Sequence, residues 1–324
     1  MADGNTDVDL DAVLAYIVDV ARAAGEMILA ARPMADAAGT KKNSTDLVTE
    51  TDRAVERMVR ERLHEGYPTF EFMGEETYTP GTRLSSSPTF IVDPIDGTTN
   101  FVHTYPYVSI SIGLAINRHP VAGVVYNPFT KQLFSAAKNR GAHLTSPVHD
   151  HVSLPLRPPV AYPGDSNTND NSGDTVTLEL EPLTGLDKCL VIIEWGSERT
   201  GNDYDVKIRT FRNLTAAKPD GGAMVHGLRS FGSAALNLCA VAAGWADLSW
   251  ESGCWAWDLC AGWVVLAEAG GRIVDANPGR WEVGLEERRC LAVRAGEGWR
   301  GVVEEFWGCV EGRLQAGEET RAPV

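Results

Sequence analysis

Residues 146–187 have no apolar periodicity and divide this chain of 324 residues into two parts. They include the sequence PLRPPVAYPGDSNTNDNSGD, which is rich in proline, asparagine, aspartate, serine and glycine. A segment of this composition buries too little apolar surface to offset the entropy lost on ordering, so we expect a flexible insertion. The chain is long enough for one large domain or two moderate ones, and we expect an N-terminal half, 1–145, and a C-terminal half, 188–324.

The N-terminal half changes its apolar period part-way along. Apolar residues recur at helical spacing over 10–28, and a second helix is expected near Thr49, where TETD resembles a capping box with aspartate in place of glutamate. Alternating residues then flank the turn NRHP, which indicates a β-hairpin. The strands expected here are 107–114, 121–126, 133–136 and 141–144. These elements predict an antiparallel sheet backed by two helices.

The C-terminal half alternates between the two kinds of element. A buried strand is expected at 189–195 and further strands at 272–275 and 290–293. Helices are expected at 233–243, 256–269 and 299–314. Such alternation predicts a layered α/β arrangement.

Charge and composition exclude several classes of protein. The formal net charge of −15 argues against a general nucleic-acid binder, because phosphate backbones require a basic surface. No apolar run approaches the roughly 20 residues that span a bilayer, and the acidic N-terminus lacks the pattern of a signal peptide. The six cysteines form no CxxC pair or zinc spacing, which favours free thiols in a reducing compartment. We therefore expect a cytoplasmic protein that binds neither nucleic acid nor membrane.

Three acidic segments are candidates for a metal site. Asp93 and Asp96 lie three apart in DPIDGTTNF, directly after the apolar run TFIV. Glu75 follows a short apolar strand, and Asp258 opens a helix-like run. Each acid alone has a structural reading, as a solvated turn residue or as a helix cap worth about 0.5–2 kcal/mol. Together they favour Mg²⁺, which prefers oxygen ligands and is commonly held by carboxylates and a substrate phosphate.

Several motifs, in their order along the chain, resemble the signature sequences of the inositol monophosphatase family. The most specific are GEE (74–76), DPIDGTTNF (93–101) and WDLCAG (257–262). The similarity extends to KKNSTDLVTETD (41–52), FVHTYPYVSISIG (101–113), GVVYNP (123–128), EWGSERT (194–200) and VHGLRSFGSAALNLC (225–239). It covers nearly the whole chain except the insertion and the ends. The fold it implies is a layered αβαβα sandwich, mixed α+β and α/β, of the type shared with fructose-1,6-bisphosphatase.

The resemblance implies two to three Mg²⁺ ions in one site. Glu75, Asp93 and the backbone carbonyl of Ile95 would hold the first ion. Asp93, Asp96 and Asp258 would hold the second, and Glu75 would help to place a third through water.

The resemblance also implies the catalytic pair. Thr98, paired with Asp52, would orient and deprotonate the attacking water, with Glu75 assisting through the third ion. Asp52 equally fits a role at the start of a helix. Gly97 lacks a Cβ, which lets the amides of Gly97 and Thr98 approach a phosphate oxygen.

Contacts to the alcohol are implied mostly in the C-terminal half. The implied substrate contacts are Asp96, Gly97, Thr98, Gly232, Ser233, Ala234, Glu251 and Asp258. Glu251 would accept hydrogen bonds from vicinal hydroxyl groups, although a solvated loop acid is an equally good reading without the resemblance. Trp255 departs from the pattern, because animal members often carry a histidine there, and we expect the rim of the pocket to prefer a different alcohol.

The expected function is an Mg²⁺-dependent phosphomonoesterase that hydrolyses myo-inositol monophosphate, or a similar small polyol phosphate, by attack of a metal-activated water. A 3′-phosphoadenosine 5′-phosphate phosphatase, a fructose-1,6-bisphosphatase-like activity and a non-catalytic sugar-phosphate-binding regulator are the alternatives. The resemblance further implies inhibition by Li⁺ and a homodimer.

Overall fold

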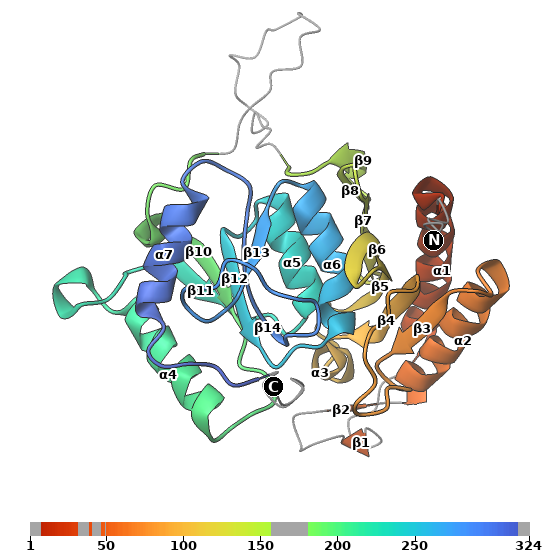
Figure 1. Cartoon of the computed structure of the whole chain (residues 1–324), viewed down its shortest axis with the longest axis horizontal. Coiled ribbons are helices and arrows are strands. Elements are labelled where there is room, and N and C mark those ends of the chain that lie inside the picture. Colours follow the sequence, from red (N-terminus) through yellow and green to blue (C-terminus); the bar gives the residue numbers. More distant parts are fainter. Residues whose placement is uncertain (1–7, 32–38, 41–46, 49, 157–180, 317–324) are drawn as a thin grey trace, which may run out of the picture.

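The computed structural model describes residues 8–31, 39–40, 47–48, 50–156 and 181–316. Thr49 and residues 157–180, which make up most of the predicted insertion, lie outside the described residues. Five layers stack in the order helices, sheet, helices, sheet, helices (Figure 1). This arrangement is the αβαβα sandwich that was predicted.

The described helices and strands differ widely in length. The helices are α1 (Leu10–Ala30), α2 (Glu50–Gly66), α3 (Thr98–Val102), α4 (Asn202–Thr215), α5 (Ala234–Ala243), α6 (Ala256–Glu268) and α7 (Trp299–Cys309). The strands of the first half are β1 (Gly39–Thr40), β2 (Leu47–Val48), β3 (Glu71–Gly74), β4 (Thr89–Asp96), β5 (Ser109–Ile116), β6 (His119–Asn127), β7 (Gln132–Ala137), β8 (Ala142–Ser146) and β9 (His149–Ser153). Those of the second half are β10 (Leu190–Ile193), β11 (Gly227–Arg229), β12 (Leu248–Ser252), β13 (Arg272–Val274) and β14 (Arg289–Val293).

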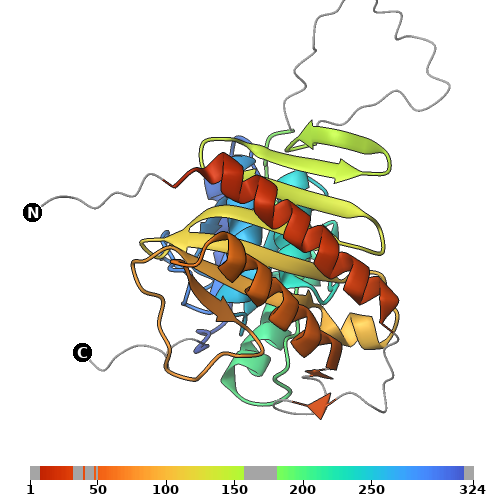
Figure 2. The same ribbon diagram turned by 90° about the vertical axis from the view of Figure 1, so that its right-hand side faces the viewer.

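The first large sheet has seven strands in the order β3-β4-β5-β6-β7-β8-β9. Its β3 and β4 are parallel, and every later pair is antiparallel. Helices α1 and α2 cover one face (Figure 2), because α1 buries a stripe of apolar residues at helical spacing against the sheet. The predicted sheet with two backing helices is therefore present. It also continues beyond residue 146, where the insertion was expected to begin, because β9 pairs with β8.

Helices α5 and α6 form the central layer and are apolar nearly all round, as befits helices buried on both sides. Two glycines of the first sheet allow α6 to lie directly on it. A Cβ at Gly113 would come within 2.4 Å of the Cys260 sulfur, and one at Gly123 within 2.6 Å of the Ala261 Cα. This close packing sets the position of the first turn of α6 relative to β4 and β5.

The second large sheet has five strands in the order β11-β10-β12-β14-β13. Strand β10 runs parallel to both β11 and β12, whereas β14 is antiparallel to its neighbours. A third core, which includes Trp250 and Phe306, lies between this sheet and α7. Sequence patterning missed β12, which is only five residues long, and α4, whose residues are mostly polar.

Two other expectations can be compared with the described residues. All six cysteines are free thiols, as predicted. Among the described helices, none combines the length and the apolar character needed to cross a membrane.

Candidate active site

Asp93 and Asp96 end the buried strand β4. In a regular strand, residues three apart point to opposite faces of the sheet. Here Asp93 lies opposite Ser111 and Asp96 opposite Ser109, so β4 has one more residue than β5 between these pairs. This bulge shifts the side-chain alternation and brings both carboxylates to one side.

Asp258 completes a cluster of three carboxylates. It lies in the first turn of α6, where its side chain accepts a hydrogen bond from the backbone N–H of Trp255. One carboxylate oxygen from each of Asp93, Asp96 and Asp258 lies within 4.8 Å of the others. The helix-cap reading and the metal-site reading of Asp258 are thus compatible, because one oxygen caps the helix while the side chain faces the other acids.

Glu75 is the fourth acid of the site. Its backbone N–H donates to the carbonyl of Val92 at 3.1 Å, so the chain after β3 continues alongside β4. Burial raises the pKa of Asp93 well above its usual range, and Glu75, Asp96 and Asp258 raise it further. Burial, with Glu75 and Asp96, raises the pKa of Asp258 to about 8. Buried acids that repel one another in this way form a site whose charge a divalent cation would neutralise.

Asp96 is also bonded to the start of α5. Its two oxygens accept hydrogen bonds from the backbone N–H groups of Ala234 and Ala235, at 3.1 and 3.0 Å, and from the hydroxyl groups of Ser109 and Ser233. Burial raises the pKa of Asp96 to about 6, against the opposing effect of these hydrogen bonds. Ser233 and Ala234, which were expected to contact the alcohol, therefore contact Asp96 in this structure.

Thr98 and Asp52 come together from distant parts of the chain. The Thr98 Oγ1 lies 3.1 Å from the Asp52 Oδ1 and 3.0 Å from the carbonyl oxygen of Ile95. Asp52 is in the first turn of α2 and only 1% exposed. Its side chain contacts Thr98 at the start of α3, which a role in starting α2 alone does not require.

Gly97 connects β4 to the short helix α3. Its φ of +93° lies in the left-handed region, which residues with a Cβ rarely adopt. A Cβ there would lie 3.0 Å from the carbonyl oxygens of Gly232 and Tyr107. Both conformation and space therefore favour glycine at the point where the chain passes the acids.

Glu194 is a residue of the site region to which the sequence assigned no role. It follows β10, is 7% exposed, and accepts hydrogen bonds from the backbone N–H groups of Phe231 and Gly232 at 2.8 and 2.9 Å. It also accepts from the side chains of Ser230 and Asn237. Glu194 thus fixes the loop before α5, and its one signal in the sequence is its place at the end of a buried strand.

Glu251 lies on β12, close enough to Asp258 for the two charges to interact. Burial raises its pKa well above the usual range, and the nearby Cys254, Glu194 and Asp258 raise it further. Lys207, on α4, acts in the opposite direction. Glu251 is therefore a partly buried acid with a cationic neighbour.

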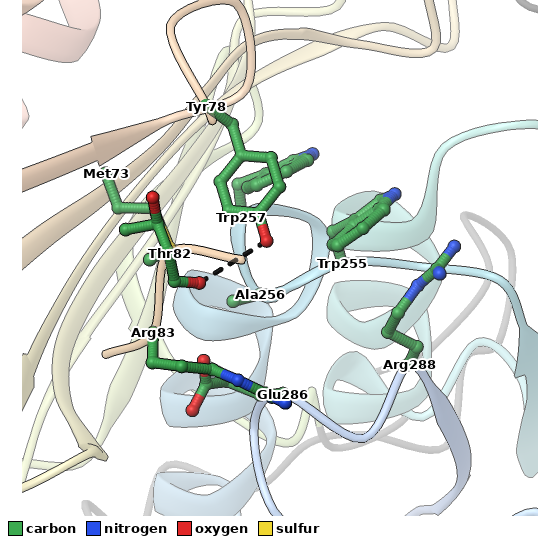
Figure 3. Close-up of a pocket in the computed structure, with 9 residues that line it drawn as sticks. All are labelled: Met73, Tyr78, Thr82, Arg83, Trp255, Ala256, Trp257, Glu286 and Arg288. Carbon is green, nitrogen blue, oxygen red and sulfur yellow. Dashed lines mark hydrogen bonds between the residues drawn. The ribbon is translucent and has the colours of Figure 1, made fainter. Parts of the chain in front are cut away.

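Aromatic side chains line a small pocket at the start of α6 (Figure 3). Trp255 and Trp257 stack with ring centroids 5.1 Å apart, and Tyr78 tilts against both. The guanidinium carbon of Arg288 lies 3.7 Å from the centroid of the Trp255 ring. These contacts hold Trp255 in place, and its effect on substrate choice stays a prediction.

Comparison with known proteins assigns the family. The model of the inositol monophosphatase family matches residues 9–311. The chain belongs to the inositol monophosphatase family. Inositol monophosphatase 2 of Saccharomyces cerevisiae is 45% identical over 283 residues, which cover 85% of this chain and 86% of that protein. Inositol monophosphatase 1 of Homo sapiens is 34% identical, over 86% of this chain and 87% of that protein.

Solved structures share the fold. The inositol monophosphatase from Anabaena has a TM-score of 0.65 and 27% identity, covering 93% of this chain and 96% of that one. The extragenic suppressor protein suhB from Bartonella henselae has a TM-score of 0.67 and 26% identity, covering 93% and 98%. This family member therefore has the predicted fold class. Its relatives support a metal-dependent phosphatase acting on inositol phosphate or a related ester.

Proposed function

We propose that this protein is an Mg²⁺-dependent phosphomonoesterase that releases phosphate from myo-inositol monophosphate or a similar small polyol phosphate. The observation that carries the proposal is the convergence of Asp93, Asp96 and Asp258 within 4.8 Å of one another. Acids this close and this buried are costly to ionise without a cation. Their oxygen donors are of the kind that Mg²⁺ prefers.

The residues that would hold Mg²⁺ are Glu75, Asp93, Asp96, Asp258 and the backbone carbonyl of Ile95. Bound Mg²⁺ would supply positive charge to the phosphate oxygens and to the leaving oxygen, and would lower the pKa of water. We propose that two to three Mg²⁺ ions bind at this site.

The proton of the attacking water would pass to the protein through Thr98. The Thr98 Oγ1 is within hydrogen-bond distance of the Asp52 Oδ1, so it can donate its own proton to Asp52 while accepting one from water. The conformation of Gly97 leaves its amide and that of Thr98 unobstructed by a Cβ, which suits an approaching phosphate oxygen. No side-chain nucleophile is needed in this scheme.

Glu251 and the loop at Gly232 would bind the alcohol. Glu251, when ionised, is an acceptor for hydroxyl groups of a polyol. Glu194 would hold the loop in position through its bonds to Phe231 and Gly232.

The test is a panel of phosphate esters incubated with the purified full chain, with Mg²⁺ and with a chelator. We expect phosphate release from myo-inositol 1-phosphate that requires Mg²⁺. Faster release from 3′-phosphoadenosine 5′-phosphate or from fructose 1,6-bisphosphate would identify one of those rival activities instead. Binding of a sugar phosphate without any release would identify a regulator.

The homodimer, the inhibition by Li⁺ and the cytoplasmic location are further parts of this proposal. They rest on the family and not on a contact in the structure. Sedimentation and a Li⁺ titration of the phosphatase activity test the first two.

A further inference from the structure

Lys207 is a buried lysine for which the expected site has no role. It lies on α4 and is 3% exposed. Its Nζ donates hydrogen bonds to the carbonyl of Ser252 at 2.9 Å and to that of Trp195 at 3.2 Å. Burying an ammonium group is costly unless it is paired and hydrogen-bonded. The two carbonyl dipoles offset part of the unfavourable free energy of burying the charge, and a negatively charged neighbour is needed to offset the remainder.

The two carbonyls mark the carboxyl ends of neighbouring parallel strands. Strands β10 and β12 pair in parallel, with Ile193 opposite Trp250. Trp195 comes just after β10, and Ser252 ends β12. Ligands in α/β folds commonly bind beyond the carboxyl ends of parallel strands. Lys207 therefore donates hydrogen bonds to both of the chain segments that contain Glu194 and Glu251.

Glu251 is the charged neighbour of Lys207. Burial lowers the pKa of Lys207, and Glu251 is the strongest influence in the opposite direction. In turn, Lys207 opposes the burial and the acids that raise the pKa of Glu251. An ionised carboxylate only accepts hydrogen bonds, whereas a protonated one also donates. The charge of Lys207 thus favours the form of Glu251 that accepts from the hydroxyl groups of an alcohol.

We propose that Lys207 is a positioning residue for the alcohol part of the substrate. Through its hydrogen bonds to the carbonyls of Trp195 and Ser252 it joins the carboxyl ends of β10 and β12 and so holds Glu251 in place, and it does not touch the ester itself. This inference rests on the proposed phosphatase function and names the group on which alcohol binding depends. It separates alcohol binding, which uses Lys207, from phosphate binding at the acidic cluster, which does not.

The test compares Lys207→Met with the wild-type full chain in Mg²⁺. For myo-inositol 1-phosphate we expect KM to rise about tenfold or more while kcat stays within about twofold. Inorganic phosphate, used as a competitive inhibitor, should keep its inhibition constant, because it reports on the acidic cluster alone. Lys207→Arg keeps the charge and should recover part of the lost affinity.

The pair Glu251→Gln and Lys207→Met gives an independent measurement. If Lys207 acts through Glu251, adding Lys207→Met to Glu251→Gln should raise KM little further, because neighbouring residues in one network are non-additive. A fall in kcat at constant KM, a weaker phosphate inhibition or fully additive effects would overturn the inference. If circular dichroism shows that Lys207→Met does not fold, Lys207→Gln, which removes the charge but keeps a hydrogen-bond donor, takes its place in the same cycle.

The proposed function fails in a different way. A wild-type protein that releases no phosphate from any ester of the panel overturns the phosphatase proposal before a variant is made. Wild-type turnover together with an unchanged KM in the Lys207 variants overturns only the role of Lys207.

Discussion

The two large sheets contribute unlike chemistry to one site. At the end of β4, burial and neighbouring acids raise the pKa of Asp93. The same two causes raise the pKa of Asp258, at the start of α6. At the ends of β10 and β12, Glu194 accepts four hydrogen bonds and Glu251 has Lys207 beside it. The seven-stranded side thus gathers acids whose charge a cation would neutralise, whereas the five-stranded side bonds Glu194 to its own donors and places a lysine near Glu251. Substitutions should therefore act differently on the two sides.

The largest effect is expected at the acidic cluster. Asp93→Asn keeps the shape of the side chain but removes a charged ligand, so phosphate release should fall by about a thousandfold or more and Mg²⁺ affinity should drop. Calorimetric titration with Mg²⁺ and the phosphatase assay measure both. Asp150→Asn, at an exposed position on β9, makes the same chemical change and should alter neither. An active Asp93→Asn enzyme would contradict the ligand assignment.

Thr98 offers a sharper test on the same side of the site. Thr98→Val replaces the hydroxyl group that contacts Asp52 by a methyl group, and kcat should fall by about a hundredfold, as for loss of general-base catalysis. Thr98→Ser keeps the hydroxyl and should retain most of the activity. A Thr98→Val enzyme that keeps full activity would contradict the role of the hydroxyl group.

On the five-stranded side, Glu194 should affect binding and stability together. Glu194→Ala leaves buried backbone and side-chain donors unpaired, and we expect a loss of about 3 kcal/mol in the free energy of unfolding and a KM about tenfold higher. Denaturant unfolding and steady-state kinetics measure these. Glu194→Gln keeps an acceptor oxygen and should cost less than half as much. If Glu194→Ala lowered kcat alone, the assignment of substrate binding to the five-stranded side would be wrong.

The smallest effect concerns pH and sharpens the contrast in charge. Asp96 and Asp258 have pKa values raised from 3.8 to about 6 and about 8, so the folded protein holds their protons more tightly than the unfolded chain. In a chelator, the contribution of these two acids to the free energy of unfolding is therefore fully present below about pH 4. It is lost as the pH rises through those two values. Because Mg²⁺ binds the ionised acids, the gain in Tm from Mg²⁺ over chelator should grow by several degrees between pH 5 and 9. A gain independent of pH would argue against a cation at these carboxylates, and Glu251→Gln should leave the trend in place.

Much of the seven-stranded side could be predicted because its signals are local. Asp93, Asp96, Gly97 and Thr98 occupy one short run after an apolar strand. The expected strands there lie within two residues of β5 to β8 at every end. The five-stranded side was predicted less well. Strand β12 has two large apolar residues, Leu248 and Trp250, and α4 is mostly polar, so the elements that carry Glu251 and Lys207 have weak apolar signals in the sequence.

The motifs alone predicted the acidic residues, the family and most of the helices and strands. Which groups meet depends on contacts between distant parts of the chain. The bulge in β4 turns Asp93 and Asp96 to one side, the packing of α6 on Gly113 and Gly123 brings Asp258 to them, and α4 carries Lys207 to Ser252. Sequence motifs reflect short-range constraints on the backbone, which is why they can be recognised without a structure. Charge balance in a buried site depends instead on distances between residues far apart in the chain.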